Sequence, residues 1–91
     1  MNATLENRIG WLRVTGAESS AELAQRLEAE MEQSSVLVVD ARRCFDAGSA
    51  LVARLCDLER RARARGRVTR FLLSDQLRAW VETLRVPLPA R

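Results

Sequence analysis

Residues 36–39, VLVV, form a short apolar run that stops at Asp40 and is followed by a polar turn and a long amphipathic segment. The β-branched composition of this run predicts a short strand that is buried on both faces. Residues 41–43 form the turn, and residues 44–49 lead directly into the amphipathic segment, which predicts a helix. Because a strand, a loop and a helix start gather backbone N–H groups and the helix dipole in one place, we expect any functional site there.

Three segments show the periodicity of amphipathic helices, namely residues 19–33, about 47–65 and a third whose apolar face runs from Leu77 to Leu84. Ser19 and Glu22 have the spacing of a capping box at the start of the first helix. Gly66 is a typical residue to follow the end of the second helix. Ser74 or Asp75 is expected to cap the third helix.

Strands are predicted over residues 9–14 and 68–73, in addition to the central run. Residues 4–6 are predicted to pair with residues 9–14 as a hairpin around Asn7. Strands that alternate with helices indicate an α/β layer fold with parallel crossovers. We therefore expect one α/β domain over residues 1–91.

The residue types present exclude several kinds of chemistry. The chain has no His, and Cys44 and Cys56 do not form a CxxC pair, so thiolate–imidazole zinc sites and Ser/His or Cys/His nucleophile pairs are excluded within it. No Gly-rich phosphate-binding motif is present. Asp40 and Asp46 are expected at the same end of the sheet, but two carboxylates without further ligands do not predict a metal site. We therefore expect no enzymatic activity, no metal and no cofactor.

All 15 basic residues are Arg, and they exceed the 12 acidic residues to give a net charge of +3. Several of them lie within residues 60–70, around the end of the second predicted helix. Cations there favour the helix dipole, and an anionic partner is the alternative interpretation. Residues 1–10 show no basic stretch followed by an apolar one, and no apolar run is long enough to span a bilayer, so we expect a cytoplasmic protein with reduced thiols.

Three residues of the loop after the central strand have interpretations that need no ligand. Asp46 stands just before the predicted helix and is placed to accept hydrogen bonds from its first N–H groups. Phe45 is expected in the core at the base of the loop. Gly48 is expected where the backbone passes close to a neighbouring segment.

In this order of elements the chain resembles a STAS domain, the fold of bacterial anti-sigma factor antagonists. The resemblance covers nearly the whole chain: an opening hairpin, a helix, a valine-rich strand ending in Asp, a short loop motif, a helix ending in Gly, a strand and a final helix. It implies a small mixed sheet, mostly parallel, with three to four helices.

In STAS domains the loop motif is typically Asp-Ser/Thr-x-Gly-Leu, and a partner kinase phosphorylates its Ser or Thr. Here residues 45–49 read FDAGS. Alignment of Gly48 with the family glycine, which we prefer, puts Asp46 at the acceptor position, whereas alignment of Asp46 with the family aspartate puts Ala47 there. Neither register has Ser or Thr at that position, although Ser49 is nearby. In the preferred register Asp46 carries a permanent charge where phosphorylation would add about −1.5 to −2.

The resemblance implies a non-enzymatic regulatory module that binds an anti-sigma factor or its kinase. An alternative within the family is a constitutive accessory subunit on the ATPase of an Mla-type phospholipid-transport ABC complex, because residues 86–89, VPLP, resemble the tail of that group. An Arg-rich nucleic-acid-binding module is an alternative of another class, disfavoured by the scarcity of aromatic residues among the arginines. The expected partner-binding residues are Arg42, Arg43, Phe45, Asp46, Ala47, Gly48, Ser49 and Arg54.

Overall fold

Strands and helices alternate along the chain, as the sequence predicts. The computed structural model describes residues 8–45 and 48–89. Their order is β1 (Ile9–Arg13), α1 (Ser20–Met31), β2 (Val36–Ala41), α2 (Ser49–Ala64), β3 (Val68–Leu73) and α3 (Asp75–Leu84). The α/β class is confirmed. Residues 4–6 and Asn7, which we predict to complete a hairpin, lie outside the described residues.

The three strands form one parallel sheet in the order β1-β2-β3. The register places Ile9, Val36 and Val68 in one row across the sheet, and Trp11, Val38 and Arg70 in the next row on the same face. The mixed character that we predict for the sheet depends on the strand at residues 4–6. The described part of the sheet is parallel throughout.

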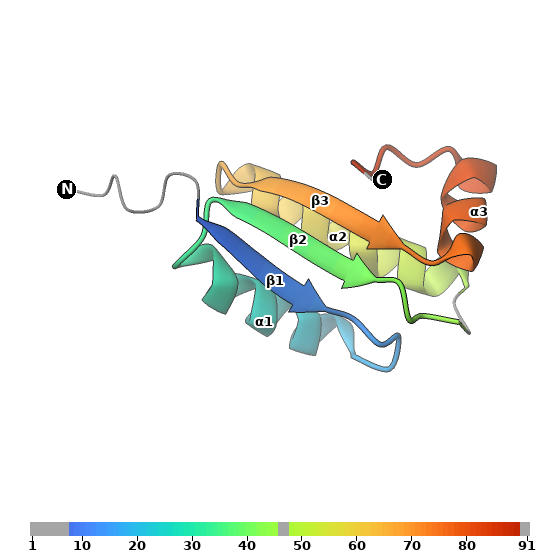
Figure 1. The fold of residues 1–91 in the computed structure, drawn as a ribbon, viewed down its shortest axis with the longest axis horizontal. Helices are drawn as coiled ribbons and strands as arrows, with labels where there is room; N and C mark the ends of the chain where they lie inside the picture. The colour runs from blue at the N-terminus through green and yellow to red at the C-terminus, as the bar shows by residue number, and fades with distance from the viewer. Residues whose placement is uncertain (1–7, 46–47, 90–91) are drawn as a thin grey trace.

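Both crossover helices cover the same face of the sheet (Figure 1). The reason is the strand order: the chain adds each new strand on the same side of the last one, and right-handed crossovers then place every helix on one face. The prediction that residues 36–39 are buried on both faces is therefore wrong. Leu37 and Val39 point toward the helices and are fully buried, whereas Val36 and Val38 point away from them and are half-buried.

The core lies between the sheet and the helices. Alternate strand residues such as Leu12, Val39 and Phe71 meet the apolar stripes of α1 and α2, of which Leu27 and Leu55 are central members. The other fully buried apolar residues include Leu23, Met31, Leu37, Leu58 and Leu77. Trp80 of α3 packs against this core, whereas Trp11 on the opposite face of the sheet is half-exposed.

The helix ends follow the predicted caps. Ser19 and Glu22 form both hydrogen bonds of a capping box at α1, each 3.1 Å long. Gly66 follows α2 with φ of +72°, a conformation that glycine adopts without strain. Ser74 Oγ caps α3 by accepting from the backbone N–H of Leu77. Among the described residues, no helix has the length and apolar content needed to cross a membrane.

Candidate functional site

The loops that follow the parallel strands meet at one edge of the sheet. Residues 14–19 connect β1 to α1, and residues 42–48 connect β2 to α2. Parallel strands end at the same edge, so these two loops lie side by side, and the start of α3 follows β3 at the same edge (Figure 1). Ligands of open α/β sheets commonly bind at this edge, outside the carboxyl ends of the strands.

Cys44 connects the three segments at this edge. Its thiol donates to the backbone oxygen of Val14 at 3.2 Å, and its own backbone oxygen accepts from Ser74 Oγ at 3.0 Å. Burial raises the pKa of the Cys44 thiol, and the nearby carboxylates of Glu18 and Asp40 raise it further. Cys44 is therefore a neutral, buried structural residue and not a nucleophile. Cys56, the other free cysteine, is partly buried.

Glu18 organises the turn after β1. Its carboxylate accepts from the backbone N–H groups of Thr15 and Gly16 at 3.0–3.1 Å, and it pairs with Arg26 at 3.3 Å. Burial of this carboxyl opposes its charge, but the backbone hydrogen bonds outweigh burial and lower the pKa of Glu18. Arg26 also donates to the backbone oxygen of Arg13, so the loop is tied to α1 as well as to itself.

The side chain of Arg42 is held in place by Asp40, near the end of β2. Its Nε and Nη2 atoms donate to the two carboxylate oxygens of Asp40 at 3.0 Å, a bidentate pairing. The hydrogen bond from the Arg42 side chain lowers the pKa of Asp40, and the charge of Arg13 contributes in the same direction. The Arg42 side chain nevertheless stays 59% exposed. It therefore presents a fixed guanidinium to the solvent beside the edge.

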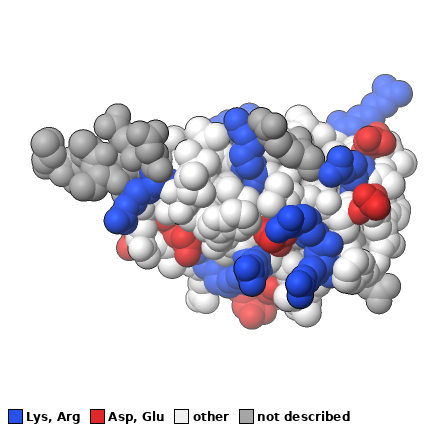
Figure 2. Space-filling view, in the orientation of Figure 1, with Lys and Arg blue, Asp and Glu red and all other residues white. Residues whose placement is uncertain are grey.

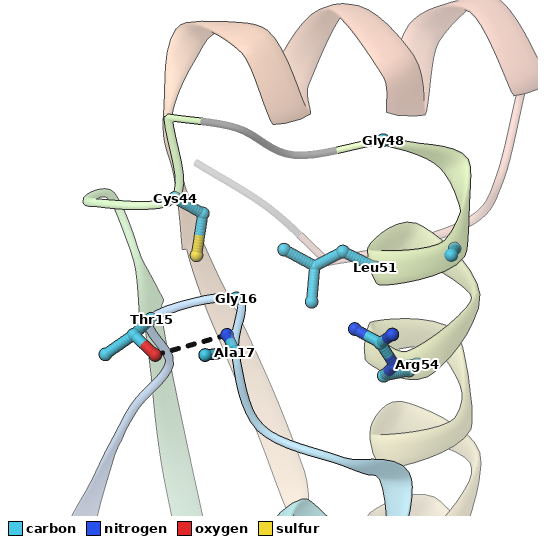
Figure 3. A pocket seen from close by; sticks show the side chains of 8 residues that line it. Thr15, Gly16, Ala17, Cys44, Gly48, Leu51 and Arg54 are labelled. Carbon is cyan, nitrogen blue, oxygen red and sulfur yellow. Dashed lines mark hydrogen bonds between the residues drawn. The ribbon is translucent and has the colours of Figure 1, made fainter.

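Two hollows flank Thr15 at this edge. The first, about 380 Å³, lies between the β1–α1 loop and the start of α2, where Leu51 and Arg54 of α2 face Thr15 and Ala17 (Figure 3). The second, about 560 Å³, is bordered by Arg13, Asp40, Arg42 and Arg43. Among the described residues, the charged side chains that line the two hollows are four arginines and one aspartate. Such an edge attracts anionic groups.

Phe45 and Gly48 differ from their expected roles. Phe45 is 73% exposed and not part of the core, because Cys44 and not Phe45 fills the base of the loop. A Cβ atom at Gly48 would meet nothing within 4 Å, and its φ is −132°, so no close approach requires glycine there. Gly48 is itself the residue before α2 and makes no side-chain cap, which contradicts the placement of Asp46 directly before the helix.

The structure brings most of the predicted partner-binding residues to this edge. Arg42, Arg43 and Gly48 border the hollows, Ser49 is exposed at the first residue of α2, and Arg54 lines the first hollow from one turn further along. Asp46 and Ala47, the two candidates for the acceptor position, lie outside the described residues. The sequence analysis missed Arg13, Thr15 and Glu18. The rule that parallel strands end at one edge could have found them, because residues 14–19 must then lie next to residues 42–48.

The arginines from Arg60 to Arg67 are engaged within the chain. Arg60 and Arg61 both pair with Asp57 at 2.7 Å, Arg63 pairs with Glu59 at 3.2 Å, and Arg65 pairs with Glu28 at 2.8 Å. Arg67 donates to the backbone oxygen of Met31, near the end of α1. Much of the charge of this cluster is therefore balanced locally. In the part of the chain that the structure describes, no three Cys, Asp or Glu side chains gather in a way that could hold a metal ion.

Comparisons with family models, with curated proteins and with solved structures find no match for this chain. The STAS resemblance consequently stays a prediction from the sequence. The class of protein that the structure itself establishes is a small α/β fold with three parallel strands and three helices in its described part.

Proposed function

We propose that this chain is a cytoplasmic, non-enzymatic protein-binding regulatory module of the kind that anti-sigma factor antagonists represent. Its docking site would be the carboxyl-edge surface, which we define as the described residues Arg42, Arg43, Phe45, Gly48, Ser49 and Arg54, with Asp46 and Ala47 between them in the sequence. Catalysis is left out of the proposal because the chain has no His to activate a nucleophile and because the thiol of Cys44 at this edge is buried, with a raised pKa.

The exposure of Phe45 is the observation that carries the proposal. A phenylalanine that is 73% exposed at a loop tip gains nothing from the core of its own chain. The exposed residues Arg42 and Arg43 precede it in the same loop. Aromatic residues and arginines are enriched at protein interfaces, and arginine is one of the residue types that most often dominate binding energy. An exposed phenylalanine in a loop that also carries exposed arginines fits an apolar pocket bordered by carboxylates on a partner.

The charge of the two hollows supports an acidic partner. Among the described residues that line them, the charged side chains are the basic Arg13, Arg42, Arg43 and Arg54 and the acidic Asp40. Opposite charges at an interface raise the association rate, and added salt screens this attraction. We therefore expect the rate of association with the partner to fall as the ionic strength rises.

The test begins with a tagged full-length chain, used to capture partners from the native host and identify them by mass spectrometry. Recovery of an anti-sigma factor or its kinase supports partner switching. Recovery of an ABC ATPase supports the constitutive-subunit alternative. The captured protein is then purified, and its affinity for the wild-type chain and for variants is measured by calorimetry.

Three variants target the carboxyl-edge surface: Phe45→Ala, Arg43→Glu and Gly48→Arg. We expect each to weaken binding at least tenfold, an effect of at least about 1.4 kcal/mol. Gly48→Arg is the sharpest, because the open space around its Cβ leaves the fold unchanged while the new side chain fills the first hollow. Leu84→Ala and Arg8→Glu are matched controls, since both residues are exposed and lie outside the carboxyl-edge surface. Equal affinity for all five variants would refute the proposed docking site.

A further inference from the structure

We infer that the face of the sheet that the described residues leave uncovered is a homodimer interface, on which a second copy of this chain stacks the same face with the two-fold axis along β2. We call this face the open face. It consists of the strand residues that point away from α1 and α2, namely Ile9, Trp11, Arg13, Val36, Val38, Asp40, Val68, Arg70 and Leu72. The inference concerns a different surface from the carboxyl-edge surface and does not depend on the proposed function.

The open face is apolar at its centre. Ile9 is 60% exposed, Trp11 52% and Val68 48%, and they adjoin the half-buried Val36 and Val38 of the central strand. In Figure 2, which looks onto this face, uncharged side chains occupy the middle and arginines gather toward the carboxyl ends of the strands. A contiguous apolar area rimmed by charge is typical of an interaction surface. The strand order explains why the chain's own crossover helices leave it uncovered.

The register makes the open face self-complementary. Trp11 and Arg70 stand in one row, at equal distances on either side of Val38. Ile9 and Val68 stand in the same relation about Val36. Neighbouring strands are about 4.8 Å apart, so each pair is separated by about 10 Å across the centre of the sheet.

A two-fold axis along β2 exchanges the two outer strands. Trp11 of one copy then faces Arg70 of the other, and the same contact is repeated on the other side of the axis. A guanidinium over an indole ring is a favourable cation–π arrangement. Ile9 meets Val68 of the second copy, and Val36 and Val38 meet their own counterparts. The axis along β2 also brings Asp40 onto Asp40, and the bidentate pairing of each Asp40 with its own Arg42 offsets these like charges. An axis across the strands would instead place Arg70 on Arg70, and the hydrogen bond from Arg70 to the backbone oxygen of Thr69 brings no negative charge to offset them.

These contacts favour a second copy over an unrelated partner because each copy supplies both halves of every pair. The face measures about 14 by 16 Å, from three strands 4.8 Å apart and five residues at 3.3 Å each. The area buried by two copies is then below the roughly 1,200 Å² of a standard stable interface. The dimer should accordingly be weak and reversible, as transient complexes with small interfaces are.

Analytical ultracentrifugation of the full chain tests the inference over about 5–500 µM. We expect the average mass to rise from 10.3 kDa toward twice that value as concentration increases. Trp11→Ala and Arg70→Glu should each shift the dissociation constant upward at least tenfold, while Leu84→Ala, an exposed apolar residue on α3, should not. Circular dichroism confirms that each variant stays folded, which is expected because all three side chains are exposed.

The double variant W11R/R70W is the decisive measurement. It exchanges the two side chains of the central row, so an axis along β2 again brings an indole onto a guanidinium, twice. We expect dimerisation close to that of the wild type. A chain that stays at 10.3 kDa throughout, as it would if another part of the chain covered the face, overturns the inference. So does a dimer that the two single variants leave intact, or one that the exchange fails to restore.

Discussion

Gly10 of β1 is the position where the fold leaves the least room for a side chain. It is buried and faces the end of α1 and the segment that leads into β2. A Cβ atom there would lie 2.5 Å from Glu30 Oε1, 2.7 Å from Ser34 Oγ and 3.1 Å from Ser34 Cβ. We therefore predict that Gly10→Ala destabilises the protein, although alanine suits a strand better than glycine does.

The contacts set the size of the effect. Glu30 is partly exposed, and its Oε1 atom lies at the end of a flexible side chain, so this oxygen can move away at little energetic cost. Ser34 is buried and its Cβ is attached to a backbone that leads directly into β2, so the strand itself must shift. Overpacking of this kind costs about 1–3 kcal/mol. Alanine also restricts the unfolded chain more than glycine does, and this stabilises the folded protein by about 0.4–1 kcal/mol. The net loss lies between about 0 and 2.6 kcal/mol, and its midpoint of about 1.3 kcal/mol corresponds to roughly 5–10 °C in Tm for a domain of this length.

Thermal unfolding followed by circular dichroism measures this loss, and a double-mutant cycle with Ser34→Gly assigns it to the contact. In the Ser34→Gly background the cost of Gly10→Ala should fall by at least half, because the closest fixed atoms are gone. A Gly10→Ala protein as stable as the wild type would refute the reasoning. An equal cost in both backgrounds would show that Ser34 is not the obstacle.

Three further predictions concern the carboxyl edge and the end of α2. Glu18→Gln should lower Tm at pH 7, and the difference in Tm from the wild type should shrink as the pH falls below 4.5. The reason is that a carboxyl whose pKa is lowered in the folded state stabilises the fold above its ordinary pKa and loses that contribution as the pH falls through the folded pKa. A difference in Tm that stays constant from pH 7 to 3 would contradict this prediction. Cys44 should react with iodoacetamide more slowly than Cys56 in the folded chain and equally fast in urea, as mass spectrometry of the two peptides would show. Gly66→Ala should cost about 1–2 kcal/mol of unfolding free energy in urea titrations, because φ is +72° there, and Gly66→Asn should cost less; equal stability of both variants would argue against strain.

The helices and most of their ends, with the start of α2 as an exception, could be predicted because the signals are local. Ser19 and Glu22 are three residues apart, and the hydrogen bonds they form stay within one turn. Gly66 and Ser74 likewise act on the helices that they adjoin. The order of strands and helices followed from the same short-range patterns. Features that depend on residues close together in the sequence could therefore be predicted without a structure.

Predictions that depend on the arrangement of elements failed or were missed. Val36 and Val38 look like core residues by composition, but whether a sheet face is covered depends on the side to which each new strand adds. Phe45 was assigned to the core because it is large and apolar, yet Cys44 occupies the space below the loop. Glu18 carries no recognisable motif, and its role depends on a turn that brings two backbone N–H groups to one carboxylate.

The tail after α3 has a consequence for aggregation. The backbone oxygen of Pro89 accepts from the N–H of Phe71 at 3.0 Å, so the tail occupies the side of β3 that faces away from β2. Pro87 and Pro89 have no N–H of their own to offer to a further strand. An extended segment from another chain can add to an unpaired strand, as in amyloid growth. At β3 such a segment would find the tail, which lacks a regular row of N–H donors. Removal of residues 86–91 should therefore expose β3 and promote fibril formation at concentrations where the intact chain forms none.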